Sequence, residues 1–302
     1  MQLSRTDLAD FAYFIAIAKH RSFRRAALEM GVTTSALSHA ITALEARRGV
    51  RLLNRTTRSV TFTAAGEELH AMIEEPLEII GQAAENLNRF RDAPAGRMRI
   101  NILEDAVSLL LDPVMPVFVE RYPEVEVDIS VSNRLIDVIG SGFDAGIRYG
   151  GTVPQDMIAQ RLSRDFRWVA AASPDYLERF GTPSTPQDLR EHRCVRIRLG
   201  NEQLYQWEFE RGGEAIAIAT PGPLTVDESH AVIGFGLSGV GIIYGAEPVL
   251  RRYLDSGVLR LVLGDWASIG SGFHVYYSGR RQLPTGLRLL IDLIREIRPL
   301  GL

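Results

Sequence analysis

Between residues 23 and 49, apolar side chains recur at the three- and four-residue spacing of amphipathic helices. The pattern breaks at Gly31, where a helix can end in a left-handed conformation. Thr33 or Thr34 can then cap a second helix by accepting its free N–H groups. The segment therefore predicts two helices joined by a tight turn. Their shared buried face would consist of Ala26, Ala27, Met30, Leu37, Ile41 and Leu44.

The outer face of the second predicted helix carries short polar side chains. Such a face suits the major groove of DNA, where it would meet base edges and phosphates, although an ordinary helical hairpin inside a larger core has the same pattern. Charge favours DNA, because residues 1–62 hold ten Lys and Arg against four acids, whereas the other residues hold 24 bases and 33 acids. The polar positions are Thr34, Ser35, Ser38, His39 and Thr42.

Residues 50–63 are rich in β-branched side chains and arginines, which predicts a short two-stranded wing. Arginines on a wing commonly enter the minor groove, where narrow A·T tracts concentrate negative potential. Arg51, Arg55 and Arg58 are the candidates, with Arg55 favoured. The alternative is that all three are solvated surface charges.

Residues 64–92 follow a helical pattern with one long apolar stripe, inside which Pro76 should bend or interrupt the helix. A stripe of this length usually packs against a helix of another chain, although packing on its own body remains an alternative. Residues 92–96 then resemble a hinge. The stripe consists of Leu69, Met72, Ile73, Leu77, Ile80, Ala84 and Leu87.

Residues 97–302 alternate between strand and helix patterns, which predicts βαβ units and largely parallel sheets. Expected strands are 97–103, 125–131, 143–148, 168–172, 207–209, 215–219, 224–226, 240–244 and 274–277. Expected helices are 107–121, 135–141, 174–180, 228–237 and 283–297.

Several motifs resemble those of LysR-type transcriptional regulators: Ser22–Ala27, Ser35–Ser38, Thr63–Gly66 and Gly142–Arg148. The resemblance covers essentially the whole chain. It implies an N-terminal all-α winged helix-turn-helix at 1–63, a dimerising linker helix at 64–92 and a C-terminal α/β two-lobed effector domain, similar to periplasmic binding proteins, at 93–302. Lobe I would span about 97–166 and 266–302, and lobe II about 167–265.

The resemblance and the outer-face pattern together give a set of DNA-contact residues. His39 departs from the family, which usually has Arg or Lys there, so the operator preference cannot be transferred from relatives. Leu53, in place of the usual Phe, is interpreted as a core substitution. The set is Ser22, Arg24, Thr33, Thr34, Ser35, Ser38, His39, Thr42, Arg51, Arg55 and Arg58.

Effector contacts are expected beyond the carboxyl ends of the strands, because ligands of open α/β sheets bind there. Arg148 and Tyr149 would clamp a carboxylate and cover an apolar ring, unless Arg148 pairs with Asp144. Asp227 has the alternative role of a helix cap. The candidates are Leu103, Glu104, Asp105, Asn133, Arg148, Tyr149, Val226, Asp227, Ser229 and Tyr244.

Other motifs carry little chemistry. No apolar run reaches membrane-spanning length, and the lone Cys194 is interpreted as a buried thiol rather than a redox sensor. The run Gly234–Gly239 matches a dinucleotide fingerprint, but it follows a helix and precedes a strand, the reverse of the required order. The histidines show no metal-ligand spacing. We therefore expect no metal, no cofactor and no catalytic site.

The expected function is that of a cytoplasmic transcriptional regulator whose effector domain alters the binding or bending of DNA. Its partners would be double-stranded promoter DNA, a small-molecule effector with carboxylates among the candidates, and a second copy in a homodimer or homotetramer, without a membrane. RNA polymerase is a further candidate partner. Two alternatives remain: an α/β enzyme with an appended DNA-binding domain, and a solute-binding protein.

Overall fold

A computed structural model describes residues 6–55, 60–86, 94–134, 136–138, 140–154, 157–279 and 283–301. The chain divides into two compact units, Met1–Leu87 and Asn88–Leu302. We call them the DNA-binding unit and the effector unit, and each is described by itself. Among the described residues, no helix is both long and apolar enough to cross a membrane.

The DNA-binding unit begins with three helices, α1 (Asp7–His20), α2 (Phe23–Glu29) and α3 (Thr34–Arg48). Between α2 and α3, Gly31 has a φ of +64°, as the predicted tight turn requires. The predicted buried face is confirmed, with Met30 partly rather than fully buried. The fully buried members are Ala26, Ala27, Leu37, Ile41 and Leu44, packed against Phe14 and Ile17 of α1.

The predicted wing is also confirmed. Strands β1 (Leu53–Arg55) and β2 (Val60–Phe62) pair in antiparallel register. Leu53 is buried in the core of this unit, as expected of a core substitution. Thr63 follows the wing and joins it to the next helix, since its hydroxyl donates to the carbonyl of Arg51 and accepts from the N–H of Gly66.

Helix α4 (Ala64–Asn86) continues through Pro76, so of the two expected effects of this residue, a bend or an interruption, the interruption was wrong. Leu69 and Ile73, near its start, pack against the core of the DNA-binding unit. Met72 and Ile80, in contrast, are 68% and 53% exposed, so part of the apolar stripe has no cover within the described chain. Leu87 and the first residues of the expected hinge lie outside the described residues.

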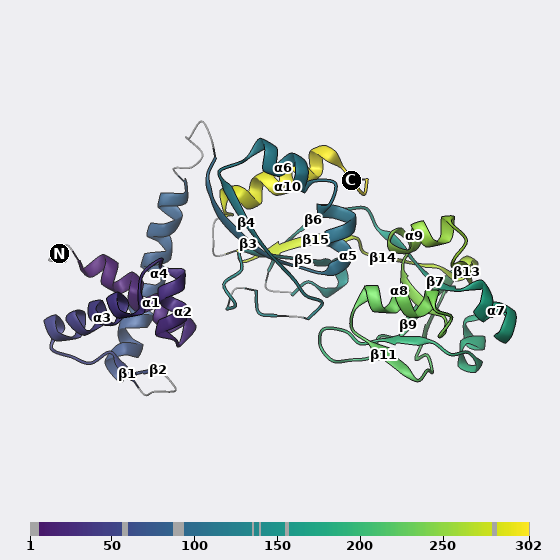
Figure 1. Cartoon of the computed structure of the whole chain (residues 1–302), viewed down its shortest axis with the longest axis horizontal. Helices are drawn as coiled ribbons and strands as arrows, with labels where there is room; N and C mark the ends of the chain where they lie inside the picture. Colours follow the sequence, from purple (N-terminus) through teal and green to yellow (C-terminus); the bar gives the residue numbers. More distant parts are fainter. Residues whose placement is uncertain are drawn as a thin grey trace. The chain divides into compact units, whose positions relative to one another are not determined.

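Lobe I of the effector unit contains a five-stranded sheet in the order β4-β3-β5-β15-β6. Strand β3 is parallel to β4 and β5, whereas β15 is antiparallel to β5 and β6. Helices α6 and α10 cover one face of this sheet (Figure 1). The strands are β3 (Gly96–Ile102), β4 (Val125–Val131), β5 (Ala145–Tyr149), β6 (Ile158–Arg161) and β15 (Phe273–Tyr277), and the helices are α5 (Glu104–Ala106), α6 (Met115–Arg121) and α10 (Thr285–Ile297).

Two expected helices of lobe I were wrong. Residues 107–121 form a π-helical turn, η2 (Val107–Leu111), and then α6, because Pro113 and Pro116 lack the N–H groups that a continuous helix needs. Within 135–141, the described residues form no helix. Asp137 accepts the N–H of Gly140 there, and this local hydrogen bond competes with helical pairing.

Lobe II is built around β7 (Phe166–Ala172), which pairs in antiparallel register with β12 (Ile243–Ala246), β13 (Arg260–Val262) and β14 (Ser268–Gly270). The expectation of largely parallel sheets was therefore wrong for this lobe. The chain passes between the lobes twice, once between β6 and β7 and once between β14 and β15. The remaining elements are α7 (Pro174–Phe180), η4 (Pro186–Glu191), β8 (Val195–Ile197), β9 (Trp207–Arg211), β10 (Glu214–Ile218), β11 (Leu224–Val226), α8 (Ser229–Leu237), α9 (Glu247–Asp255) and η5 (Gly264–Trp266).

Candidate DNA-contact surface and effector cavity

Helix α3 presents most of the predicted DNA contacts to the outside. Thr34, Ser35, His39 and Thr42 are exposed, and Ser38 is partly buried. Thr33 caps the helix, because its hydroxyl accepts the N–H of Ala36 at 3.2 Å. Its hydroxyl oxygen also lies 3.0 Å from that of Ser35, and the Thr42 hydroxyl donates to the Ser38 carbonyl at 2.9 Å. The polar face thus stands on a helix whose opposite face is fully buried.

The other predicted DNA contacts lie around this helix. Ser22 caps α2 by accepting the N–H of Arg25, and Arg24 is exposed on α2. Arg51 is exposed just before the wing. The backbone of Arg55 belongs to β1, while its side chain and the whole of Arg58 lie outside the described residues.

Some bases of this unit are held by its own acids. Arg47 contacts Asp7 at 3.3 Å and also hydrogen-bonds Asp10, and Arg48 contacts Asp7 at 2.6 Å. Because both aspartates lie at the start of α1, these contacts fasten the end of α3 to α1. Lys19 is likewise paired with Glu29 at 3.0 Å. The positive charge that composition assigns to this segment is therefore partly neutralised within the fold.

A cavity of about 510 Å³ lies between the two lobes of the effector unit, within the usual size range of small-molecule sites. Glu104 and Val226 are not among its lining residues. The lining includes eight of the ten predicted effector contacts: Leu103, Asp105, Asn133, Arg148, Tyr149, Asp227, Ser229 and Tyr244.

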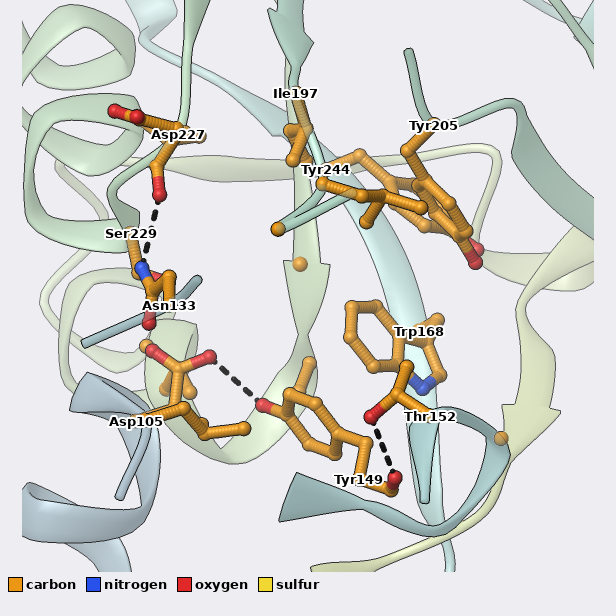
Figure 2. Close-up of a pocket in the computed structure, with 18 of the residues that line it drawn as sticks. Asp105, Asn133, Tyr149, Thr152, Trp168, Ile197, Tyr205, Asp227, Ser229 and Tyr244 are labelled. Carbon is orange, nitrogen blue, oxygen red and sulfur yellow. Dashed lines mark hydrogen bonds between the residues drawn. The ribbon is translucent and has the colours of Figure 1, made fainter. Parts of the chain in front are cut away.

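Sequence reasoning identified only part of one wall of this cavity, and it missed Trp168 and Tyr205 there. Trp168, Tyr205 and Tyr244 lie on that wall in Figure 2, and Glu208 and the segment 197–201 also line the cavity. The Trp168 ring centroid lies 5.0 Å from that of Tyr149, 5.9 Å from that of Tyr244 and 6.3 Å from that of Tyr205. These four rings form what we call the aromatic wall. Trp168 lies early in β7 rather than at its carboxyl end, so the strand-end rule could not identify it.

Asp105 lies beside the aromatic wall and is only 9% exposed. Its carboxylate accepts the hydroxyl of Tyr149 at 2.8 Å, and Ser229 from the other lobe also favours its ionised form. Burial raises the pKa of Asp105 despite both effects, and burial also raises the pKa of Tyr149 well above its ordinary value. The Tyr149 hydroxyl therefore remains a proton donor at neutral pH.

Arg148 lines the cavity, but its guanidinium group faces the protein. It donates to the carbonyls of Ile147, Ser132 and Arg134 at 2.8, 3.1 and 3.2 Å, and to the carbonyl and side-chain oxygen of Asn101. Its Nε is buried without a partner. Desolvation lowers the pKa of Arg148. The alternative of an Arg148–Asp144 pair does not appear among these contacts; Asp144 accepts the N–H of Arg99 instead.

Two sets of hydrogen bonds join the lobes at the edge of the cavity. Asn133 donates to the carbonyl of Asp227 at 3.0 Å, as Figure 2 shows. Glu104 of lobe I lies 3.0 Å from His230 Nδ1 and within 4.8 Å of Glu228, both at the start of α8. Burial, followed by the nearby Glu228, raises the pKa of Glu104.

The ligand-capable atoms of Glu104, Glu228 and His230 lie within 4.8 Å of one another. The histidine spacing in the sequence does not indicate this grouping, because the residues come from two lobes. The hydrogen bond between Glu104 and His230 already brings two of these side chains together.

A winged helix-turn-helix unit followed by a two-lobed unit with a central cavity defines a ligand-responsive DNA-binding protein. The family model "Bacterial regulatory helix-turn-helix protein, lysR family" matches residues 8–67, and the model "LysR substrate binding domain" matches residues 91–298. The chain belongs to the LysR family of transcriptional regulators. It has the DNA-binding and effector-binding domains of that family.

Relatives match along almost the whole chain. The uncharacterized HTH-type transcriptional regulator YcaN of Escherichia coli (strain K12) is 36% identical over 96% of this chain and 95% of its own length. The regulator PgrR of the same strain is 33% identical, over 97% and 98%.

Solved structures give the same architecture. Full-length AphB of Vibrio cholerae, a virulence activator, has a TM-score of 0.63 at 25% identity and covers 96% of this chain and 98% of its own. The LysR-type regulator CrgA of Neisseria meningitidis has a TM-score of 0.59 at 26% identity and covers 100% of both chains.

Proposed function

We propose that this regulator reads its operator in the cytoplasm with the exposed face of α3, and that a small molecule in the interlobe cavity changes how it binds or bends DNA. The observation that carries the proposal is the exposed polar face of α3, which stands on a fully buried apolar face and begins at the Thr33 cap. A rigid helix of this kind can insert its N-terminal side chains into the major groove.

His39 is the proposed base reader that most distinguishes this chain. It is exposed at the centre of the polar face of α3, where an imidazole offers a different donor geometry from a guanidinium. Ser22 and Arg24, near the start of α2, and Arg51, beside the wing, would contact the phosphate backbone. Contacts of this second kind fix position and add affinity without reading sequence.

The proposal is tested by selecting binding sites for the full-length protein from randomised duplexes. We expect His39→Arg to change the preferred bases while affinity for unrelated DNA stays equal or rises slightly, because the substitution adds a positive charge. Ala71→Arg is the matched control, because it adds the same charge at an exposed position of α4, and it should select the wild-type sites. Identical sites for His39→Arg and the wild type would exclude His39 as a base reader.

We also propose that the exposed apolar part of α4 pairs two chains. Ile79 and Ile80 expose more than half of their surface, and no described residue covers them. Replacing Leu77 and Ile80 together by Glu should give monomers in light scattering, because four carboxylates would have to be buried at a dimer interface. Ala71→Glu, off the apolar stripe, should leave the dimer intact. A dimer that persists in the double variant would contradict this assignment.

For the cavity, the expected carboxylate effector depended on Arg148. The position of Arg148 in the lining supports a ligand near it, but the oxygens that already surround its guanidinium group weaken the case for a carboxylate clamp. The proposed effector is therefore a small molecule in the cavity, without a carboxylate clamp at Arg148.

A further inference from the structure

Most of the groups that would bind an anionic ligand are already occupied by oxygens of the protein. Both terminal nitrogens of Arg148 donate to protein oxygens, and its remaining N–H group, at Nε, is buried without a hydrogen-bond partner among the described residues. A carboxylate would have to displace these internal hydrogen bonds before it could bind Arg148. The other lining arginine, Arg198, lies 3.7 Å from Glu202 and is half-exposed.

The starts of two helices near the cavity are also occupied. At α5, the N–H of Glu104 donates to the side-chain oxygen of Asn133 at 3.4 Å. At α8, Glu228 accepts the N–H of Ala231 at 2.9 Å, and Glu104 accepts that of His230 at 3.4 Å. Helix N-termini bind anions through such N–H groups. Here the protein's own side chains take that role, and a carboxylate ligand would compete with two glutamates.

Two carboxylates of the lining, in contrast, form no ion pair within the described part of the chain. Asp105 is buried and accepts the neutral hydroxyl of Tyr149, while Ser229 and the nearby His230 also favour its ionised form. A buried carboxylate is normally paired with a cation. Glu208 lines the same cavity and lies near enough to Tyr205 to contribute to the raised pKa of that hydroxyl.

The aromatic wall connects these two carboxylates. Tyr149 at one end donates to Asp105, Tyr205 at the other lies near Glu208, and Trp168 lies against both rings. Aromatic faces attract cations as well as apolar surfaces, and the attraction grows when the cation is desolvated. The wall can therefore accept a molecule with an apolar body and a positively charged end.

We propose that the interlobe cavity binds an organic cation, whose ammonium group donates to Asp105 while its apolar or aromatic body lies against Trp168. Glu208 adds a second negative charge along the wall. This assignment rests on the proposed effector role of the cavity and specifies its ligand class.

The test uses three molecules with the same phenylethyl body and different terminal groups: phenethylamine, 2-phenylethanol and 3-phenylpropionate. Isothermal titration of the full-length protein should show that phenethylamine binds at least about tenfold more tightly than the alcohol, with the carboxylate weakest. Asp105→Asn should reduce the affinity for phenethylamine by about tenfold and change that for the alcohol by less than about twofold. Trp168→Leu should weaken all three.

A matched pair of variants isolates the charge along the wall. Glu208→Gln should reduce phenethylamine affinity by about threefold, as expected for a partly solvated charge. Glu210→Gln, on the same strand and outside the cavity lining, should change nothing. An equal preference of the protein for amine and alcohol, or no effect of Asp105→Asn on that preference, would overturn the proposal.

The remaining outcomes separate the ligand class from the effector role. If 3-phenylpropionate binds most tightly and Trp168→Leu removes that binding, the cavity keeps its role and the cation assignment is wrong. Absence of phenethylamine binding at millimolar concentration also overturns the assignment. Thr152→Trp places a large side chain in the cavity lining. The effector role itself fails if this variant folds but leaves ligand-dependent DNA binding and reporter expression unchanged.

Discussion

Two buried aspartates, one in each unit, have opposite kinds of partner. Asp7 in the DNA-binding unit is 1% exposed and contacts two arginines, Arg48 at 2.6 Å and Arg47 at 3.3 Å. Asp105 in the effector unit is 9% exposed and accepts the neutral hydroxyl of Tyr149, and its pKa is raised by burial. Burial desolvates both carboxylates, but only Asp7 forms ion pairs that compensate for this cost within the described residues.

The difference indicates different roles for the two residues. A buried carboxylate whose cations belong to the fold fastens one helix to another, and Asp7 does this between α1 and α3. A buried carboxylate at a cavity, without a cation of the fold, is stabilised either by a proton or by a positive ligand. The same substitution at both positions should therefore have unequal effects.

The larger effect is expected for Asp7→Asn. The substitution removes charge-assisted hydrogen bonds to Arg47 and Arg48, so the opening free energy of α1–α3 should fall by about 2 kcal/mol. Hydrogen–deuterium exchange of these helices should accelerate by about thirtyfold. Glu68→Gln, at an exposed position of α4, is the matched charge control and should leave exchange unchanged. Equal exchange in Asp7→Asn and the wild type would show that these ion pairs do not stabilise the junction.

The DNA-binding unit was also the part that the sequence predicted best. Leu37, Ile41 and Leu44 follow one another at helical spacing, and Gly31 marks the turn, so each signal lies within a few residues of the structure that it specifies. The contacts of Arg47 and Arg48 with Asp7 were not predictable in this way. They join positions about forty residues apart, and the charge count treated the arginines as free for DNA.

The cavity was predicted by topology but not by local pattern. The strand-end rule identified Asp105, Asn133 and Tyr149, which line it. It did not identify Trp168, because lobe II is antiparallel and β7 presents this residue near its beginning. It also gave Arg148 a ligand-facing role, because the sequence does not show that the loop at 132–134 supplies carbonyls to that side chain.

The second substitution, Asp105→Asn, should have a small effect at neutral pH and a diagnostic one on acidification. Because the folded pKa of Asp105 is raised, the native state takes up a proton before the unfolded chain does, so the wild type gains stability as pH falls from about 7 toward the ordinary aspartate pKa of about 4. The Asn side chain still accepts the Tyr149 hydroxyl and does not titrate. The free energy of unfolding of the variant should therefore lie within about 1 kcal/mol of the wild-type value at neutral pH. The variant should not show the gain in stability that Asp105 gives the wild type on acidification.

All three tryptophans, Trp168, Trp207 and Trp266, belong to the effector unit, so urea unfolding followed by their fluorescence reports on this unit alone. Asp128 is the control of opposite sign, because its hydrogen bond with Arg99 lowers its pKa. The contribution of ionised Asp128 to stability is lost only when the pH falls below the ordinary pKa range of aspartate. Asp128→Asn should therefore keep the wild-type change in stability between about pH 7 and about pH 5. If Asp105→Asn kept that response as well, Asp105 would not be the uncompensated charge, and the contrast with Asp7 would fail. Phenethylamine sharpens the same measurement, because a bound ammonium group favours the ionised carboxylate and should reduce the wild-type acid gain without affecting Asp105→Asn.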